Sequence, residues 1–384
     1  MIVRDEATVI ERCLNSVLPW ITHWAIVDTG SSDETHNLIA STLGSLPGKL
    51  LAVRWSGNFS KHRNQTIALA RALLRDHGDA RLLFIDADET LVVARPQRFA
   101  KMIVERSFIS WWVTHEDWCF RKLGIARLRN VGEWVGSTHE HLLLHNVSHG
   151  GNRVQRCAEL KNGNDGFRSR QSATRKLDQL ALKKAVQREE ASFRSHFFLG
   201  RTYEIQQRYL LAARQFEQAG DVPGISHDER WQALWGTARS LLFVDELSAA
   251  RTFVAAHRFA PNRSEALVQL AALATIRSCQ IEAVTLSICA LNCSEPRSTS
   301  MYDRAAYRWK AADELCIAAF ALHDVVSINL AIHHYRKLLS EKSVPENQVQ
   351  RILTNLQLLV SRLHQSQKTG VATPRKIGKP SANP

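Results

Sequence analysis

The alternation of short apolar runs with segments of helical periodicity over about the first hundred residues constrains the fold of this chain most strongly. Three amphipathic segments separate the runs; the first has Val9, Ile10, Cys13, Leu14, Val17 and Leu18 on one face, the second follows Asp33, and the third begins near Ser60. Strands that alternate with helices usually form a parallel sheet covered by helices. We therefore predict an α/β domain with the order βαβαβαβ and strands at 1–3, 24–28, 50–54 and 82–86.

The second half of the chain shows helical periodicity with a repeat. Ala249, Phe253, Ala256 and Pro261 are spaced by 4, 3 and 5 residues, as at the end of a tetratricopeptide repeat (TPR), and Ala283 follows Ala249 by 34 residues. Small residues are expected where two helices of a hairpin cross closely, and an aromatic ring fills the gap to the next hairpin. The pattern predicts an all-α, TPR-like domain, with an irregular helical bundle as the alternative. One unit earlier, the same template fits Leu199, Gly200, Tyr203, Ala212, Phe216 and Ala219.

Composition shifts divide the chain further. A stretch rich in glycine, asparagine and arginine between the two patterns is typical of a linker. The last residues carry Lys368, Arg375, Lys376 and Lys379 without an acid, which is typical of a disordered basic tail. We predict an α/β domain over 1–150, a linker over 151–170, the helical domain over 171–364 and the tail over 365–384.

Charge and cysteine content exclude several classes of protein. The net charge is +13, from 50 Lys and Arg against 37 Asp and Glu, but no zinc-finger or RNP-type motif accompanies it, so we expect no nucleic-acid partner. The seven cysteines are scattered and form no CxxC, which predicts reduced thiols. No apolar run is long enough to span a bilayer, and acids follow the first residues at once, unlike a signal peptide. We expect a cytoplasmic protein with possible peripheral contact to an anionic membrane.

Acidic side chains follow three of the predicted strands, at the positions of Asp5, Asp28 and Asp86. Ligands of open parallel sheets bind at the carboxyl ends of the strands, so these acids are candidate binding residues. Asp86 and Asp88 are two residues apart and lie on one side of an extended backbone, where a divalent cation would relieve their repulsion. The pair predicts a site for Mn²⁺ or Mg²⁺; solvated acids in a turn are the alternative.

Two further segments carry candidate chemistry. Arg63 lies in a cationic stretch that opens the third predicted helix, where an anion would be stabilised. In the segment 136–145, His139 could complete a manganese shell and Glu140 could act as a general base, with Glu116 and Asp117 as reserve candidates. A zinc site on one helical face, formed by His141, His145 and His149, is a weaker alternative.

Five segments together resemble the motifs of bacterial family 2 glycosyltransferases with C-terminal tetratricopeptide-like repeats: 1–6, 27–33, 58–64, 85–89 and 136–140. The resemblance implies a GT-A fold and a metal-dependent, inverting transfer of a sugar from a nucleotide-diphosphate sugar, with a UDP-sugar the first expectation. The acceptor is left open between a glycan, a lipid-linked glycan, and a peptide or protein.

The resemblance also assigns roles to the candidate residues. Asp28 would meet the nucleotide base, Arg63 the base or the phosphates, and Asp86 the ribose or the metal. Asp88 would bind the metal, with His139 and Glu140 beside the diphosphate and the acceptor, and Asp5 stands where the family often has Asn. Metal and Arg63 would offset the charge on the departing nucleoside diphosphate, and Glu140 is the preferred catalytic base.

Two other functions are consistent with the same sequence. A catalytically silent TPR-like scaffold would use only the helical half for binding a partner. A nucleotidyltransferase would also use paired acids and a metal, but would form pyrophosphate. Product analysis distinguishes the two enzymes, and the Asp88→Ala variant distinguishes either enzyme from the scaffold.

Overall fold

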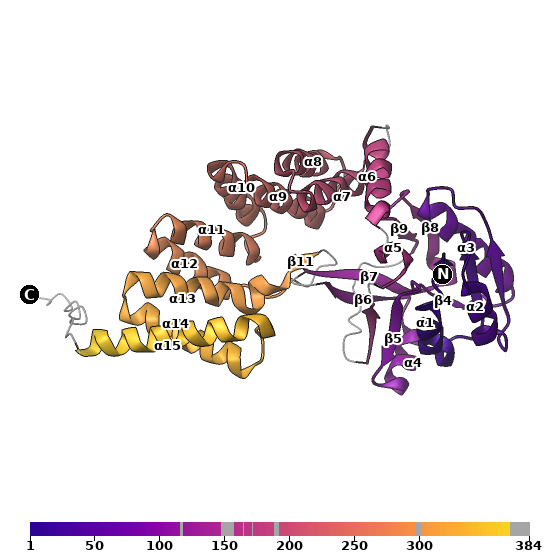
Figure 1. Cartoon of the computed structure of the whole chain (residues 1–384), viewed down its shortest axis with the longest axis horizontal. Helices are drawn as coiled ribbons and strands as arrows, with labels where there is room; N and C mark the ends of the chain where they lie inside the picture. The colour runs from indigo at the N-terminus through magenta and orange to yellow at the C-terminus, as the bar shows by residue number, and fades with distance from the viewer. Residues whose placement is uncertain are drawn as a thin grey trace, which may run out of the picture. The chain divides into compact units, whose positions relative to one another are not determined.

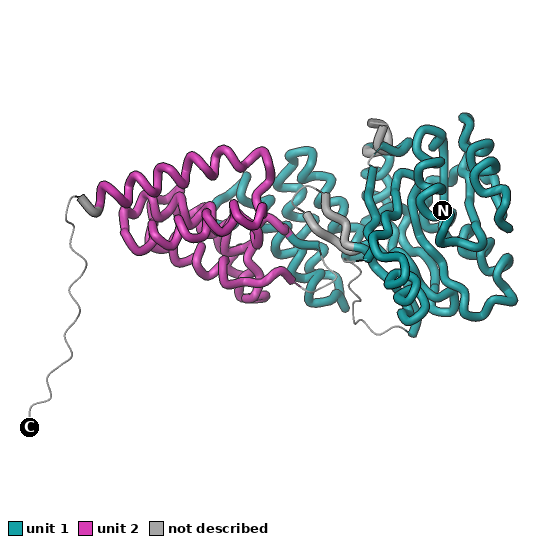
Figure 2. Tube along the Cα trace, turned by 90° about the horizontal axis from the view of Figure 1, so that it is seen from below, with its two compact units in different colours: residues 1–249, 297–302 teal, residues 250–296, 303–384 magenta. Residues whose placement is uncertain are grey.

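The computed structural model describes residues 1–115, 118–146, 157–163, 165–170, 172–187, 192–296 and 301–368. The chain forms two compact units, one of residues 1–249 with 297–302 and one of residues 250–296 with 303–384 (Figure 2). Strands and short helices make up the start of the first unit, and helical hairpins follow them along the chain (Figure 1). The predicted limits at residues 150 and 170 lie within the first unit and stay a prediction.

The strands of the first unit belong to several small sheets. Parallel pairing joins β1, β2 and β3, whereas the pairs β4 with β7, β6 with β7, β5 with β10, and β8 with β9 are antiparallel. The strands are β1 (Ile2–Val3), β2 (Trp24–Asp28), β3 (Gly48–Ala52), β4 (Arg81–Leu83), β5 (Glu89–Val93), β6 (Phe108–His115), β7 (Trp118–Arg127), β8 (Val131–Val135), β9 (His141–Leu144), β10 (Ala158–Asn162) and β11 (Tyr302–Asp303).

This arrangement confirms an α/β amino-terminal part but corrects the expectation of one mostly parallel sheet. The four predicted strands are present as β1 to β4, yet β4 pairs with β7 and not with β1 in the described part of the chain. Hydrophobic periodicity locates a strand, but it does not specify which neighbour the strand pairs with. The GT-A fold is therefore not established by these sheets.

Helices cover the parallel strands as the periodicity predicts. The apolar face of α1 buries Ile10, Cys13, Leu14 and Val17. Asn58 caps α3, because its side chain accepts a hydrogen bond from the Lys61 backbone N–H. The helices of this part are α1 (Ile10–Val17), α2 (Thr35–Leu43), α3 (Phe59–Leu73), α4 (Pro96–Glu105) and α5 (Phe167–Arg170), with 3₁₀ turns η1 (Leu18–Trp20) and η2 (Leu128–Asn130).

The rest of the described chain is helical. Reciprocal capping boxes begin α7 at Ser192 and α9 at Ser226, and Asp324 caps α14. The helices are α6 (Ser172–Gln187), α7 (Phe193–Ile205), α8 (Tyr209–Asp221), α9 (His227–Leu241), α10 (Glu246–Phe259), α11 (Glu265–Ile276), α12 (Gln280–Leu291), α13 (Ala311–Leu322), α14 (Val325–Ser340) and α15 (Glu346–Lys368), with a π-helical turn η3 (Ala306–Lys310) before α13.

The small and aromatic positions of the predicted repeat are buried. Phe216 of α8 is fully buried beside Gly200 of α7 and Gly236 of α9. A Cβ atom at Gly236 would lie 2.7 Å from the Phe216 ring, and one at Gly200 would lie 3.0 Å from it. Both glycines therefore make room for one aromatic ring between three helices. Ala249, Phe253, Ala256 and Ala283 are also fully buried, which confirms the TPR-like spacing.

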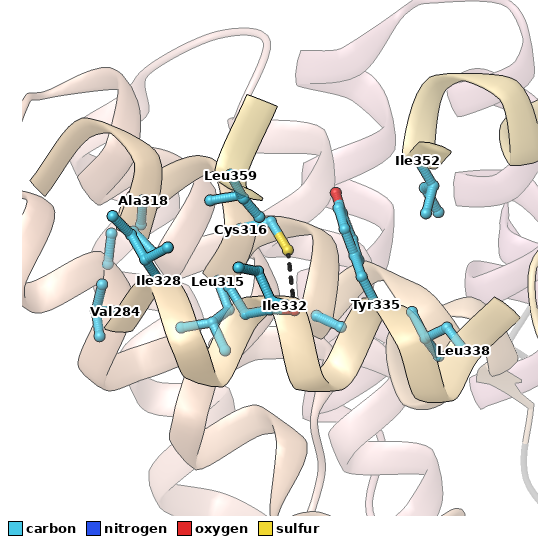
Figure 3. Close-up of a cluster of buried hydrophobic side chains, with 14 residues drawn as sticks. Val284, Leu315, Cys316, Ala318, Ile328, Ile332, Tyr335, Leu338, Ile352 and Leu359 are labelled. Carbon is cyan, nitrogen blue, oxygen red and sulfur yellow. Dashed lines mark hydrogen bonds between the residues drawn. The ribbon is translucent and has the colours of Figure 1, made fainter. Parts of the chain in front are cut away.

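The second unit has its own core, built from α12 to α15 (Figure 3). Leu315, Ile328 and Tyr335 are fully buried there. The Tyr335 hydroxyl donates to Asp313 Oδ1 at 2.6 Å, so the buried ring carries a satisfied polar group.

Two predictions concern the membrane and the tail. None of the helices in the described ranges has both the length and the apolar character that crossing a bilayer requires. α15 continues to Lys368, so the first residues of the expected disordered tail are helical, and the tail from residue 369 lies outside the described residues.

Candidate functional site

A group of partly buried ionisable side chains, here called the Arg63 cluster, joins five parts of the first unit. Arg63 Nη2 lies 2.9 Å from Asp86 Oδ1, and Arg63 Nε lies 2.6 Å from Glu140 Oε1. Lys122 Nζ lies 2.6 Å from both Asp86 Oδ2 and Glu89 Oε1. Ion pairs thereby link helix α3, the segment after β4, strand β5, strand β7 and the segment before β9.

Opposite charges in the Arg63 cluster favour the ionised form of Asp86. Burial alone would raise the pKa of Asp86, but Arg63 and Lys122 together lower it far below its usual range. Burial and the charge of Asp86 raise the pKa of Glu89, despite the contact with Lys122. The guanidinium of Arg63 also lies over the Trp134 ring, 4.8 Å from its centroid. The side chains of the cluster are thus held by one another.

Asp88 lies next to the Arg63 cluster but has other surroundings. Its backbone oxygen accepts a hydrogen bond from Gly163 N at 2.8 Å, and a Cβ atom at Gly166 would lie 3.3 Å from the Asp88 side chain. Burial, together with the charge of Asp86, raises the pKa of Asp88. The segment around β10 therefore packs against Asp88.

Asp5 and Asp28 organise the turn after β2. Asp28 is buried, and its Oδ1 accepts hydrogen bonds from the backbone N–H groups of Gly30 and Ser31, both at 2.9 Å. Asp5 Oδ1 accepts from Ser32 N at 2.6 Å. Carboxylates that accept backbone N–H bonds hold a loop in shape, so the observed contacts of both acids are structural.

His139 packs against the first helical hairpins. Its ring stacks on Phe198 of α7 with centroids 4.1 Å apart and an interplanar angle of 3°, and its carbonyl accepts from Arg194 Nη2 at 2.9 Å. Burial lowers the pKa of His139, which favours the neutral ring. Next to it, Thr138 Oγ1 donates to Asp178 of α6 at 3.2 Å. The loop before β9 thus fixes α6 and α7 to the strands.

The structure brings together Arg63, Asp86 and Glu140 of the predicted site residues and places His139, Asp5 and Asp28 in other contacts. Across the described ranges, no group of three His, Cys, Asp or Glu side chains is arranged to hold a metal ion. The roles of these residues in binding, catalysis and metal coordination, and the predicted Mn²⁺ or Mg²⁺, stay predictions.

Sequence analysis did not predict two residues of these contacts, Lys122 and Phe198, because neither belongs to a recognisable motif. Glu89 does have a signal in the sequence, because it ends the acidic run of 86–89. His141 lies in strand β9, which excludes the helical arrangement assumed for a zinc site. The reserve candidates Glu116 and Asp117, and the third zinc candidate His149, lie outside the described residues.

The helical hairpins of the first unit expose a second candidate surface. Tyr209 at the start of α8 stacks on Phe243 in the α9–α10 turn, with centroids 4.3 Å apart, so the two hairpin turns are adjacent. Large apolar side chains at these turns are 47% to 68% exposed. We call this surface the turn patch; it consists of Ile205, Leu210, Phe243, Val244 and Leu247.

The chain was compared with protein families, curated proteins and solved structures. No protein-family model matches the chain. A TPR repeat-containing protein of Synechococcus elongatus is 37% identical over 131 residues, which is 34% of this chain and 30% of that protein. Two crystal structures of MamA cover 53% of this chain and 97% and 90% of their own chains, at 11% identity and TM-scores of 0.27 and 0.26.

These findings correct the assignment to family 2 glycosyltransferases. The curated relative is described as a TPR repeat-containing protein. The glycosyltransferase activity, the classification as an enzyme and the nucleotide-sugar donor are therefore withdrawn. The short motifs misled because the same acidic and basic residue types also build internal ion pairs and capped turns, as Arg63, Asp86 and Asp28 do here.

Proposed function

We propose that this protein is a TPR-like scaffold that binds a protein partner through the turn patch. One observation carries the proposal: large apolar side chains are exposed at adjacent turns of helical hairpins. Phe243 is 66% exposed, Leu247 59% and Ile205 68%. Exposed apolar side chains that lie together, in contrast to scattered ones, mark interaction surfaces. The TPR repeat-containing relative supports the same function.

The energetics favour recognition of an apolar partner surface. Complete burial of a large apolar side chain stabilises an association by about 1.5–3 kcal/mol, and an aromatic residue near the centre of an interface contributes most. Phe243 is the aromatic member of the turn patch and is held on one side by Tyr209. We therefore expect Phe243 to be the anchor of the interface.

The strands of the first unit supply a rigid base for this surface. The contact of His139 with Phe198 and the hydrogen bond from Arg194 fix α7 to the loop before β9. Helix α7 in turn packs on Phe216 through Gly200. A surface on rigid elements loses less conformational entropy on binding than a surface on flexible loops.

The test is a photo-crosslinking amino acid at position 243, compared with one at position 177. Leu177 of α6 is 63% exposed and lies outside the turn patch, which makes it a matched control. We expect a crosslinked protein at position 243 that is absent at position 177. The captured protein is then purified, and its Kd for the full chain is measured with the wild type, Phe243→Asp and Leu177→Asp.

The proposal predicts that Phe243→Asp weakens this Kd by about tenfold or more, equivalent to about 1.4 kcal/mol, while Leu177→Asp leaves it unchanged. Equal Kd values for all three proteins would exclude the turn patch as the interface. A second assay measures Tm with nucleotide sugars and Mn²⁺. A saturable rise in Tm that Asp88→Ala abolishes would contradict a catalytically silent scaffold.

A further inference from the structure

Two cysteine thiols lie together at the end of helix α12 in the second unit. Cys289 is in the last turn of α12, and Cys293 follows the last helical residue, Leu291, by two positions. Cys289 is exposed, whereas Cys293 is half-buried. The thiol of Cys293 donates to the Cys289 carbonyl oxygen, with Sγ and O 3.5 Å apart. The sulfur of Cys293 therefore lies over the turn that carries Cys289, as side chains four residues apart on a helix share a face.

The two thiols have different surroundings. Helix α12 packs against both α11 and α13 (Figure 1), and Cys293 packs against a small core between these elements. Burial, together with the charges of Glu265 and of a Cys289 thiolate, raises the pKa of the Cys293 thiol. Access and thiolate character determine how fast a thiol reacts. A reagent in solution therefore reaches Cys289 first. The buried members of the core are Leu267, Val268, Ala290, Ala306 and Ala311.

The spacing of the two residues is compatible with a disulfide after a small movement. Four residues of α-helix rise by about 6 Å, and the Cα atoms of a disulfide lie about 4.4–6.8 Å apart. Their Cβ atoms, about 5–6 Å apart at this spacing, would have to approach to about 3.5–4.5 Å. Cys289 is held within α12, whereas Cys293 lies beyond the helix and its amide donates to Ala290 O at 3.1 Å. We therefore expect Cys293 to be the residue that moves.

We propose that Cys289 and Cys293 form a dithiol modification site, which a low-molecular-weight disulfide oxidises to an internal disulfide. The Cys289 thiolate attacks one sulfur of the reagent, the S–S bond of the reagent breaks, and one reagent thiol leaves. The Cys293 thiolate then attacks the Cys289 sulfur of this mixed disulfide, and the second reagent thiol leaves. Both cysteines are thereby oxidised, the reagent is reduced to two thiols, and these thiols take up the two cysteine protons. The chemistry does not depend on the scaffold function.

The disulfide changes the core beside α12. Movement of Cys293 toward Cys289 withdraws its side chain from the core that includes Leu267 and Ala306. Protein interiors are close-packed, so the loss of these contacts loosens the packing of α12 on α11. An exposed disulfide that requires such a movement is readily reduced again. Oxidation at this site is therefore reversible and is coupled to the local stability of the second unit.

The test treats the reduced full chain with oxidised glutathione and follows the mass of the intact chain and of its peptides. Cys279, at the start of α12, is exposed and serves as the matched control. We expect Cys279 to retain bound glutathione, and Cys289 and Cys293 to form an internal disulfide without it. Cys293→Ser should retain glutathione at Cys289, whereas Cys279→Ser should form the internal disulfide as the wild type does. Excess dithiothreitol should restore the reduced mass.

Hydrogen exchange of treated and untreated samples measures the coupling to the core. The treated wild type should lose protection in the last turn of α12 and around Leu267, while treatment of Cys293→Ser should leave its protection unchanged. Unreacted Cys289, glutathione retained at Cys289 in the wild type, or a disulfide that includes Cys279 would overturn the site. An internal disulfide that forms without any loss of protection would overturn its coupling to the core.

Discussion

At the scale of single residues, Lys122 offsets the charge of two acids of the first unit, the partly buried Asp86 and the buried Glu89. It contacts both Asp86 and Glu89, whose side chains are 32% and 3% exposed, and Arg63 neutralises only part of their charge. A buried ion pair contributes little net stability, but removal of one partner leaves an uncompensated charge in a medium of low dielectric constant. In the observed contacts, the side chains of the Arg63 cluster pair with one another, which is a structural role.

We predict that Lys122→Met lowers the free energy of unfolding by about 3–5 kcal/mol, because Asp86 and Glu89 then lose their shared cation. The matched control is Lys161→Met, since the pair of Lys161 with Glu159 is exposed and is expected to contribute less than about 1 kcal/mol. Urea unfolding of the full chain measures both. Similar losses for the two variants would contradict the role assigned to Lys122.

A second residue-scale prediction concerns pH. Burial, aided by the charge of Asp313, raises the pKa of Glu314 from 4.5 to about 7. The folded chain therefore binds a proton that the unfolded chain has released between pH 4.5 and pH 7, so stability falls as pH rises through this window. Because the side chain is partly exposed, we expect a loss of about 2 kcal/mol by pH 8.

Glu314→Gln removes this titration while keeping the shape of the side chain. Urea unfolding at pH 4.5 and pH 8 measures the free-energy difference between the wild type and the variant. We expect the variant to gain stability relative to the wild type as pH rises, by about the amount that Glu314 loses. A difference that does not change with pH would show that Glu314 titrates normally in the folded chain.

At the scale of elements, the packing of the helical hairpins depends on one ring held by two glycines. Phe216 lies against Gly200 and Gly236, from the helices on either side of α8. Alanine has the higher helix propensity, by up to about 1 kcal/mol, so glycine at these positions is explained by packing and not by local preference. The same reasoning accounts for the alternation of small and aromatic residues along the repeat.

We predict that Gly236→Ala is destabilising by about 1–3 kcal/mol, because the new Cβ atom would lie 2.7 Å from the Phe216 ring in a filled core. Gly200→Ala, with 3.0 Å to the same ring, should cost less. In a double-mutant cycle, Phe216→Leu should remove most of the penalty of Gly236→Ala. Additive effects of Phe216→Leu and Gly236→Ala would contradict a direct contact as the cause.

At the scale of the whole molecule, the two units contain separate hydrophobic cores. The core of the second unit includes Leu315 and Tyr335, while Ile109 belongs to a core of the strands and α1 in the first unit. The described members of these two clusters do not overlap. Units with separate cores can lose protection against hydrogen exchange separately.

We predict that Leu315→Ala, at a cost of about 2–5 kcal/mol, increases hydrogen exchange in α12 to α15 while that of β2 and α1 is unchanged. Ile109→Ala should have the opposite distribution. Hydrogen exchange with mass spectrometry on the full chain resolves the two patterns. Equal loosening of both units by either variant would show one cooperative fold.

Much of the local structure could be predicted from the sequence. The period of Ile10, Cys13, Leu14 and Val17 specifies the buried face of α1, and the spacing of Ala249 and Phe253 specifies a TPR-like hairpin. These features depend on residues close together in the chain, which is why periodicity reports them. The partner of β4 is β7, a segment about forty residues further along the chain, and no local pattern encodes this pairing.

The sequence by itself determined where the first four strands and the helices between them form, which face α1 buries, and that the second half is helical. Only the tertiary structure decided what the candidate site residues contact: Asp86 meets Arg63 and Lys122, and His139 meets Phe198. The physical reason is that the hydrogen-bonding partner of a carboxylate or an imidazole can be a ligand, a backbone donor or a group of opposite charge. Which of these it finds depends on the approach of chain segments that lie far apart in the sequence.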